Sequence, residues 1–218
     1  NAQKQVESRN FQTRKNVLQY DDVMNTQREV IYKERRKVLD GEDLQESIQN
    51  MLHNTVENAI RGHMGEQKHM TAEDFREATA QFRNMFLKPG ELELTDEELQ
   101  QYDEDGLVEL VVGKAKEVYA AREQEFGSPL MRELERVLML RVVDEYWMDQ
   151  IDAMNDLKQG IGLRGYAQTD PVVAYKKEGY EMFEQMIAAI QEETLRRLFL
   201  VRLRQNQEVR RERVAKVT

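Results

Sequence analysis

One apolar stripe dominates the first forty residues of the chain. Its members recur mainly at seven-residue spacing: Val17, Val23, Met24, Val30, Ile31 and Val38. Apolar residues at such intervals lie on one face of an α-helix. The pattern therefore predicts one long helix over residues 5–39, which Asp40 and Gly41 bring to an end.

Shorter helices are predicted in the next part of the chain, over residues 44–60, 71–86, 95–101 and 107–126. Thr71 and Thr95 stand before acidic residues as helix caps do, and Thr95 with Glu98 has the spacing of a capping box. The segment "LKPGELEL" (87–94) separates two of these helices.

Two longer helices are predicted after residue 127. Ser128-Pro129 is a strong helix start, and the next thirty residues contain neither Gly nor Pro. A helix of that length extends over about 45 Å. Its apolar face comprises Leu134, Val137, Leu140, Val143, Trp147, Ile151, Met154 and Leu157. Asp170-Pro171 starts the second helix, which is predicted to reach about residue 205 with Val173, Tyr180, Phe183, Ile187, Ile190 and Leu198 on its apolar face.

The segment between these helices, "GIGLRG" (160–165), fits the GxGxxG pattern of dinucleotide-binding proteins. That pattern binds a pyrophosphate only where a strand passes into a helix. Here it follows a helix, and the chain contains no convincing strand, so a nucleotide site is not expected. Gly160, Gly162 and Gly165 are instead predicted to stop one helix and allow a turn. The predicted fold is all-α and ends in an antiparallel two-helix hairpin.

Composition narrows the chemistry further. The chain has no cysteine, which excludes disulfides and thiolate zinc sites. Its three histidines lack metal-ligand spacing, and no phosphate loop or catalytic set is apparent. We therefore expect no cofactor and no enzyme activity in this chain. The polar N-terminus resembles neither a signal peptide nor a natural start and indicates a cut within a longer protein.

Charge is unevenly distributed along the chain, whose net charge is −9. Residues 91–109 carry nine acids and no base, and residues 196–218 carry eight Lys or Arg against two Glu. A basic tail can contact nucleic acid or anionic lipid. Arginine-rich helix ends are more often simply solvated, so that explanation is favoured and no nucleic-acid partner is expected.

The hairpin turn carries the most distinctive side chains. Arg164 and Tyr166 lie on a glycine-rich turn, where their own chain offers little to bury them. Tyr166 either folds back on the helix ends or remains exposed. An exposed amphipathic ring suits sequence-tolerant contact with another polypeptide.

Three long strings resemble the SecA family of preprotein translocase ATPases. They are "VESRNFQTRKNVLQYDDVMNTQR" (6–28), "LMLRVVDEYWMDQIDAM" (138–154) and "LKQGIGLRGYAQTDPVVAYKKEGYEMFEQM" (157–186). The resemblance implies a helical scaffold segment over residues 1–51, a helical wing domain over 52–127, and a second scaffold segment over 128–218. The last segment contains the family's two-helix finger (130–205), with its tip at 160–170.

The resemblance also implies roles for individual residues. Tyr166, Arg164 and Leu163 would contact the translocating polypeptide, and Gly160, Gly162 and Gly165 would be the hinge of the tip. Trp147, Val143 and Met154 would pack the finger and restrain the motor.

Partners are implied in the same way: the SecYEG channel, preproteins and the parent's own motor domains, which use ATP and magnesium. The parent would then be cytoplasmic and attached peripherally to the inner face of the cell membrane. A different class of function, a self-associating coiled-coil scaffold or homodimer, is left open by the seven-residue spacing of the first helix.

Overall fold

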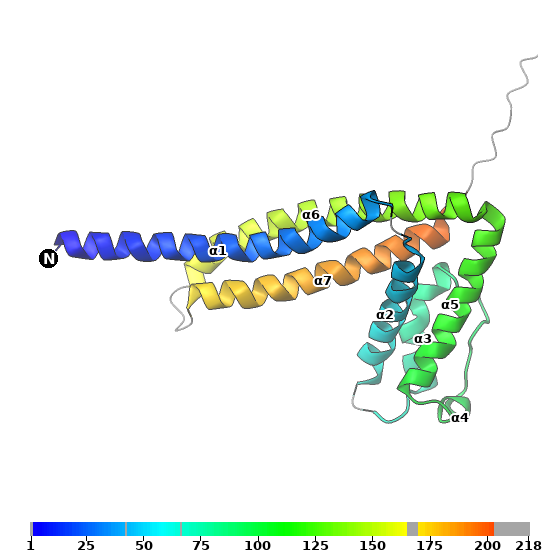
Figure 1. Ribbon diagram of the computed structural model, residues 1–218. Coiled ribbons are helices and arrows are strands. Elements are labelled where there is room, and N and C mark those ends of the chain that lie inside the picture. Colours follow the sequence, from blue (N-terminus) through cyan, green and yellow to red (C-terminus); the bar gives the residue numbers. More distant parts are fainter. Residues whose placement is uncertain (1, 42, 66, 165–169, 203–218) are drawn as a thin grey trace, which may run out of the picture.

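The computed structural model of the chain describes residues 2–41, 43–65, 67–164 and 170–202, and every regular element within them is a helix (Figure 1). The elements are α1 (Ala2–Leu39), α2 (Gln45–Met64), α3 (Ala72–Thr79), the 3₁₀ helix η1 (Ala80–Asn84), α4 (Asp96–Leu99), α5 (Glu104–Phe126), α6 (Ser128–Arg164) and α7 (Pro171–Leu200). The predicted all-α fold is confirmed. None of the described helices is both long enough and apolar enough to cross a membrane.

The helices form two groups. The three longest, α1, α6 and α7, lie side by side and form what we call the rod (Figure 1). Helices α2 to α5 with η1 form a compact side group that stands across one end of the rod. Helices α6 and α7 run antiparallel with extensive contacts, so the predicted hairpin is present. The N-terminal part of α1 extends beyond the end of α6 and the start of α7 (Figure 1).

Helix caps lie where the sequence indicates them. The Thr95 hydroxyl accepts a bond from the backbone N–H of Glu98 at 3.4 Å, and the Glu98 carboxylate accepts one from the N–H of Thr95 at 2.9 Å. At the start of α7 the Asp170 carboxylate accepts from the N–H of Val172 at 2.8 Å. These bonds satisfy N–H groups that the first turn of a helix leaves without partners.

Two sharp corners join the rod to the side group. The first follows α1, where Gly41 has φ +80°, and the second lies at Gly127, also φ +80°, the single residue between α5 and α6. Glycine adopts such angles without the strain that a Cβ adds. Residue 127, near which a domain boundary is predicted, forms this second corner, and residue 51, near which the other is predicted, is part of α2.

One large core connects both groups. Inside the side group Phe75, Phe82 and Leu107 are almost completely buried. The end of α7 adds Phe199, whose ring lies 5.3 Å from that of Phe86 and 6.3 Å from that of Tyr119. The rod and the side group therefore share buried surface beyond the two chain corners.

Tertiary packing corrects several details of the predicted pattern. Helix α6 continues through Gly160 and Gly162 to Arg164, so the predicted helix end at Gly160 is wrong. Burial of Ile161 (1% exposed) offsets the weak helix propensity of its glycine neighbours. Two residues expected on the buried face of the second long helix, Val173 and Tyr180, are 58% and 61% exposed.

Further corrections concern the end of α7 and side chains on α6 and α1. Helix α7 ends at Leu200, before the predicted residue 205. Val137, predicted on the apolar face of α6, is 49% exposed. On α1, Ile31 and Val38 are buried whereas Val17 is 42% exposed, so only the C-terminal part of the stripe packs inside the rod.

Candidate functional site

The candidate site is the α6/α7 hairpin, and its turn end is held by a small core. Met154, Ile161 and Tyr175 are each 1% exposed and form a cluster separate from the large one. Tyr20 of α1 packs its ring edge-on against Tyr175 at 4.7 Å between centroids. The ammonium group of Lys158 lies 5.6 Å from the centre of the Tyr20 ring, a cation–π contact. Helix α1 thus braces the hairpin close to its turn.

A glycine permits the close approach of three helices just behind this cluster. A Cβ added to Gly179 of α7 would lie 2.7 Å from Met154 Cε, 3.2 Å from Met154 Sδ and 3.7 Å from Val23 Cγ1. The missing side chain therefore makes room for Met154. The same probe at Gly160 meets no atom within 4 Å, so packing does not require a glycine there.

A buried polar chain joins the three helices of the rod at the same level. The side-chain amide of Gln27 donates to the backbone oxygen of Gly179 at 3.0 Å, and the side-chain oxygen of Gln27 accepts from Gln150 at 3.2 Å. Both glutamines are 5% exposed. Since a buried amide without partners is costly, these bonds specify the register of α1 on the hairpin.

Trp147 belongs to the large buried cluster, together with Ile31 of α1 and Met186 of α7. It is 6% exposed, and Val143, one turn earlier, is 8% exposed. The indole is therefore part of the core to which all three helices of the rod contribute.

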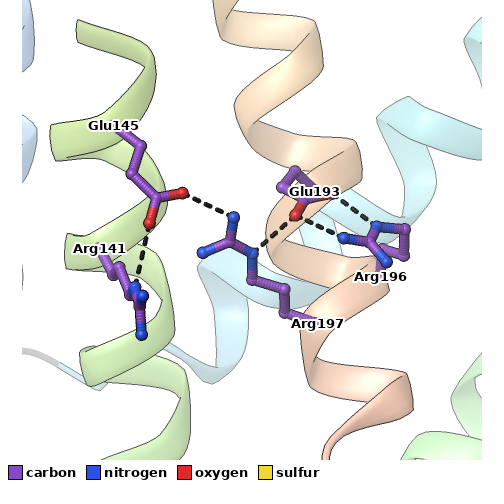
Figure 2. A network of polar contacts seen from close by, with 5 residues as sticks. All are labelled: Arg141, Glu145, Glu193, Arg196 and Arg197. Carbon is purple, nitrogen blue, oxygen red and sulfur yellow. Dashed lines mark hydrogen bonds and ion pairs between the residues drawn. The ribbon is translucent and has the colours of Figure 1, made fainter. Parts of the chain in front are cut away.

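An ionic network, which we call the clamp, holds α6 to α7 towards the C-terminal end of α7 (Figure 2). Arg197 of α7 donates to Glu145 of α6 at 2.6 Å and to Glu193 of its own helix at 2.6 Å. Arg141 completes one side with a bond to Glu145 at 3.0 Å, and Arg196 the other with bonds to Glu193 at 2.6 and 2.7 Å. Arg197 is therefore the single side chain that spans the two helices in this network.

The network shifts the acidity of its carboxylates. Hydrogen bonds from Arg196 and then Arg197 lower the pKa of Glu193 to about 2, against the opposing effect of its partial burial. Hydrogen bonds from Arg197 and Arg141 also lower the pKa of Glu145. Both carboxylates are thus stabilised in the charged form that the helix clamp requires.

A family model for the SecA Wing and Scaffold domain matches residues 1–202. The chain belongs to the SecA wing and scaffold family. Three relatives, each named protein translocase subunit SecA, agree with this assignment. The one from Pelotomaculum thermopropionicum is 49% identical over 97% of this chain, that from Heliobacterium modesticaldum 48% over 92%, and that from Finegoldia magna 49% over 100%. The chain covers 23–24% of the length of these relatives.

The SecA-like tip residues fall at the edge of what the structure describes. Leu163 and Arg164 occupy the last turn of α6. Gly165 and Tyr166 lie outside the described residues, so their predicted roles remain predictions. Gly160 and Gly162 are both helical, which places the start of the turn later than the sequence suggests.

Sequence reasoning missed the polar residues inside this SecA region. Glu193 and Arg197 are four residues apart, a spacing that signals a helical ion pair. No comparable local signal marks Gln27, whose partners lie 123 and 152 residues away. Glu135, fully buried, was likewise not anticipated.

Proposed function

We propose that this chain is the scaffold, wing and two-helix finger of a protein-translocation motor. In this proposal the rod is the scaffold, the side group is the wing, and the α6/α7 hairpin is the finger. The chain couples the parent's ATPase domains to the SecY channel and presents the finger tip to the translocating polypeptide. Membership of the SecA wing and scaffold family supports the proposal, and one structural observation carries it: a long hairpin is braced by α1 along its length.

Bracing matters because a lever must transmit force without bending. The hairpin is joined to α1 at its turn end through the Tyr20–Tyr175 contact and farther along through Gln27 and Gln150. The clamp through Arg197 ties its two helices together near the side group. A displacement of α1 would therefore be passed to the tip as a nearly rigid motion.

A neighbouring face of α1 supports docking of the parent's motor domains. Four apolar residues there, each one position after the heptad series of the buried stripe, are largely exposed: Phe11, Leu18, Tyr32 and Leu39 at 70%, 65%, 56% and 55%, with Asn25 at the intervening position. Exposed apolar rows of this extent are typical of surfaces that another domain covers. Trp147, Val143 and Met154 are buried on α6 and would restrain the motor by fixing the position of α1 on the hairpin.

Nucleotide chemistry belongs to the parent in this proposal. ATP and magnesium would bind the motor domains, and this chain alone would bind neither. Titration calorimetry of the isolated chain with Mg-ATP is expected to show no heat of binding. A micromolar ATP site on the chain would contradict the assignment of nucleotide binding to the motor domains.

At the tip, Tyr166 would contact the polypeptide through its amphipathic ring, with Leu163 and Arg164 beside it and Gly160, Gly162 and Gly165 as the hinge. The test is transport of a model preprotein into SecYEG vesicles by the full-length protein. Tyr166→Met is expected to keep most transport, because a large apolar side chain still meets the substrate, and Tyr166→Gly to lose it. Melting temperatures of both variants control for folding. Undiminished transport by Tyr166→Gly would remove the substrate role.

The same vesicles separate this proposal from a self-associating coiled coil. The proposal predicts that the full-length protein binds SecYEG vesicles on the cytoplasmic side, as a peripheral membrane protein. A pure coiled-coil scaffold would bind none. Burial of Ile31 and Val38 inside the rod already supports the first alternative, since the same stripe would form the seam of a dimer.

A further inference from the structure

The two corners that join the rod to the side group meet at one arginine. Arg132, in the first turns of α6, lies 2.9 Å from a carboxylate oxygen of Glu123 on α5. It also lies 3.7 Å from Asp43 on the connection between α1 and α2, and 3.2 Å from Glu135 on its own helix. A single guanidinium therefore touches both chain corners.

The region around Arg132, where the rod meets the side group, is called the joint below. Its negative charges outnumber its positive charges. Three carboxylates, those of Asp43, Glu123 and Glu135, surround Arg132. Arg136, the other cation that lines the joint, is paired with Glu133. Fully ionised, the three acids around Arg132 exceed it by two negative charges.

Glu135 is the acid that water reaches least. Its side chain is 0% exposed, and neither of its carboxylate oxygens accepts a hydrogen bond from any described residue. It borders a cavity of about 220 Å³ lined by Gly41, Asp43, Leu44, Arg132, Glu135 and Arg136. Burial, together with the negative charge of Asp43, raises the pKa of Glu135 to about 7. A buried carboxyl in such surroundings favours its neutral form.

We propose that Glu135 is a proton-linked latch at the joint between the side group and the rod. With a proton on Glu135 the joint is closed as in the structure. When the side group swings away and water reaches the carboxyl, the proton passes to solvent and the ionised acid remains hydrated. By linkage, solution pH near neutrality then sets how readily the side group moves.

The direction of the effect follows from the raised pKa. Below pH 4.5, the ordinary pKa of a glutamate, Glu135 holds its proton in both the folded and the unfolded chain. Its stabilising contribution to the folded chain is then fully present. It is lost as pH rises through about 7, because the folded chain must then bury a charge. Between pH 5 and pH 8 the unfolding equilibrium constant is expected to rise about 100-fold from this group, since each pKa unit is a factor of ten.

The experiment compares denaturant unfolding of the chain and of two variants across pH 5 to 8. Glu135→Gln keeps the shape of the side chain and cannot ionise. Its free energy of unfolding is therefore expected not to fall between pH 5 and pH 8 as that of the wild type does, and to exceed the wild-type value at pH 8. Asp149→Asn, an exposed acid fourteen residues farther along α6 and outside the cavity at the joint, is the control and should follow the wild-type pH dependence. Equal pH dependence in wild type and Glu135→Gln would overturn the proposal.

Two further measurements keep the test decisive if Glu135→Gln folds poorly. Asp43→Asn retains the oxygen that accepts the Gln45 N–H and removes a negative charge near Glu135. The midpoint of the fall in stability should therefore lie at a lower pH in this variant. Because the chain has no native cysteine, spin labels at Met148→Cys and Arg83→Cys report the angle between rod and side group. Their distance distribution is expected to broaden from pH 5 to pH 8. A midpoint unmoved by Asp43→Asn, or a distance distribution independent of pH, would contradict the latch.

Discussion

Two glycines in the hairpin provide a matched test of how closely its helices pack. Alanine is favoured over glycine in a helix by about 0.5–1 kcal/mol, and this gain applies to Gly160→Ala and Gly179→Ala alike. At Gly160 the new methyl group meets no atom within 4 Å, so the variant should be stabilised by that amount.

At Gly179 the same methyl group would lie 2.7 Å from Met154 Cε, in a site where Met154 is 1% exposed. Forcing an extra methyl group into a packed core costs about 1–3 kcal/mol. Because Met154 is flexible, the lower part of that range applies. We therefore expect Gly179→Ala to be neutral or destabilised by up to about 0.5 kcal/mol, and so to lie about 1 kcal/mol below Gly160→Ala.

Denaturant unfolding of the isolated chain measures both free energies. A Met154→Ala background supplies the control, because it removes the side chain that the new methyl group meets. In that background Gly179→Ala should stabilise the chain by about 0.5–1 kcal/mol, as Gly160→Ala does in the original chain. If Gly179→Ala stabilised the original chain as much as Gly160→Ala, the close approach of α6 and α7 at this level would be refuted.

The remaining predictions concern the core of the rod and its clamp. Trp147→Ala should lower the free energy of unfolding by about 3–5 kcal/mol, as truncation of a buried aromatic side chain does. The same variant should raise the basal ATPase activity of the full-length protein. Unchanged ATPase activity would remove only the regulatory role of Trp147. Gln27→Ala should cost about 1–3 kcal/mol in urea unfolding by leaving Gln150 without its acceptor. Because the pKa of Glu193 is lowered to about 2, its contribution is present above pH 4.5 and lost as pH falls through 2. Glu193→Gln should flatten that acid limb of the stability profile, whereas the exposed neighbour Glu192→Gln should leave it intact.

Local signals allowed much of the fold to be predicted. Thr95 and Asp170 cap helices with their own side chains, and such bonds depend only on residues a few positions away. Gly41 and Gly127 end helices because they adopt positive φ angles at low cost. These features follow from short sequence patterns, so helix number and order were accessible without a structure.

The features that could not be predicted depend on contacts between segments far apart in the sequence. Gly160 is a poor helix residue, yet α6 continues past it because Ile161 is buried beside Met154 and Tyr175. Glu135 lies on the side of α6 that packs at the joint, where its neighbours come from segments far apart in the chain. The polar partner of Gln27 is equally distant. Such residues appear as ordinary surface polar positions until the helices are assembled.

The role of the tip is tested most directly by site-specific crosslinking in the full-length protein during transport. A photoreactive residue in place of Tyr166 is compared with one in place of Met148, which is 64% exposed on α6, eighteen residues before Tyr166. A preprotein arrested in the channel is expected to be captured from position 166 and not from position 148. Capture from neither position, or equally from both, would contradict the claim that the tip of the hairpin meets the translocating polypeptide.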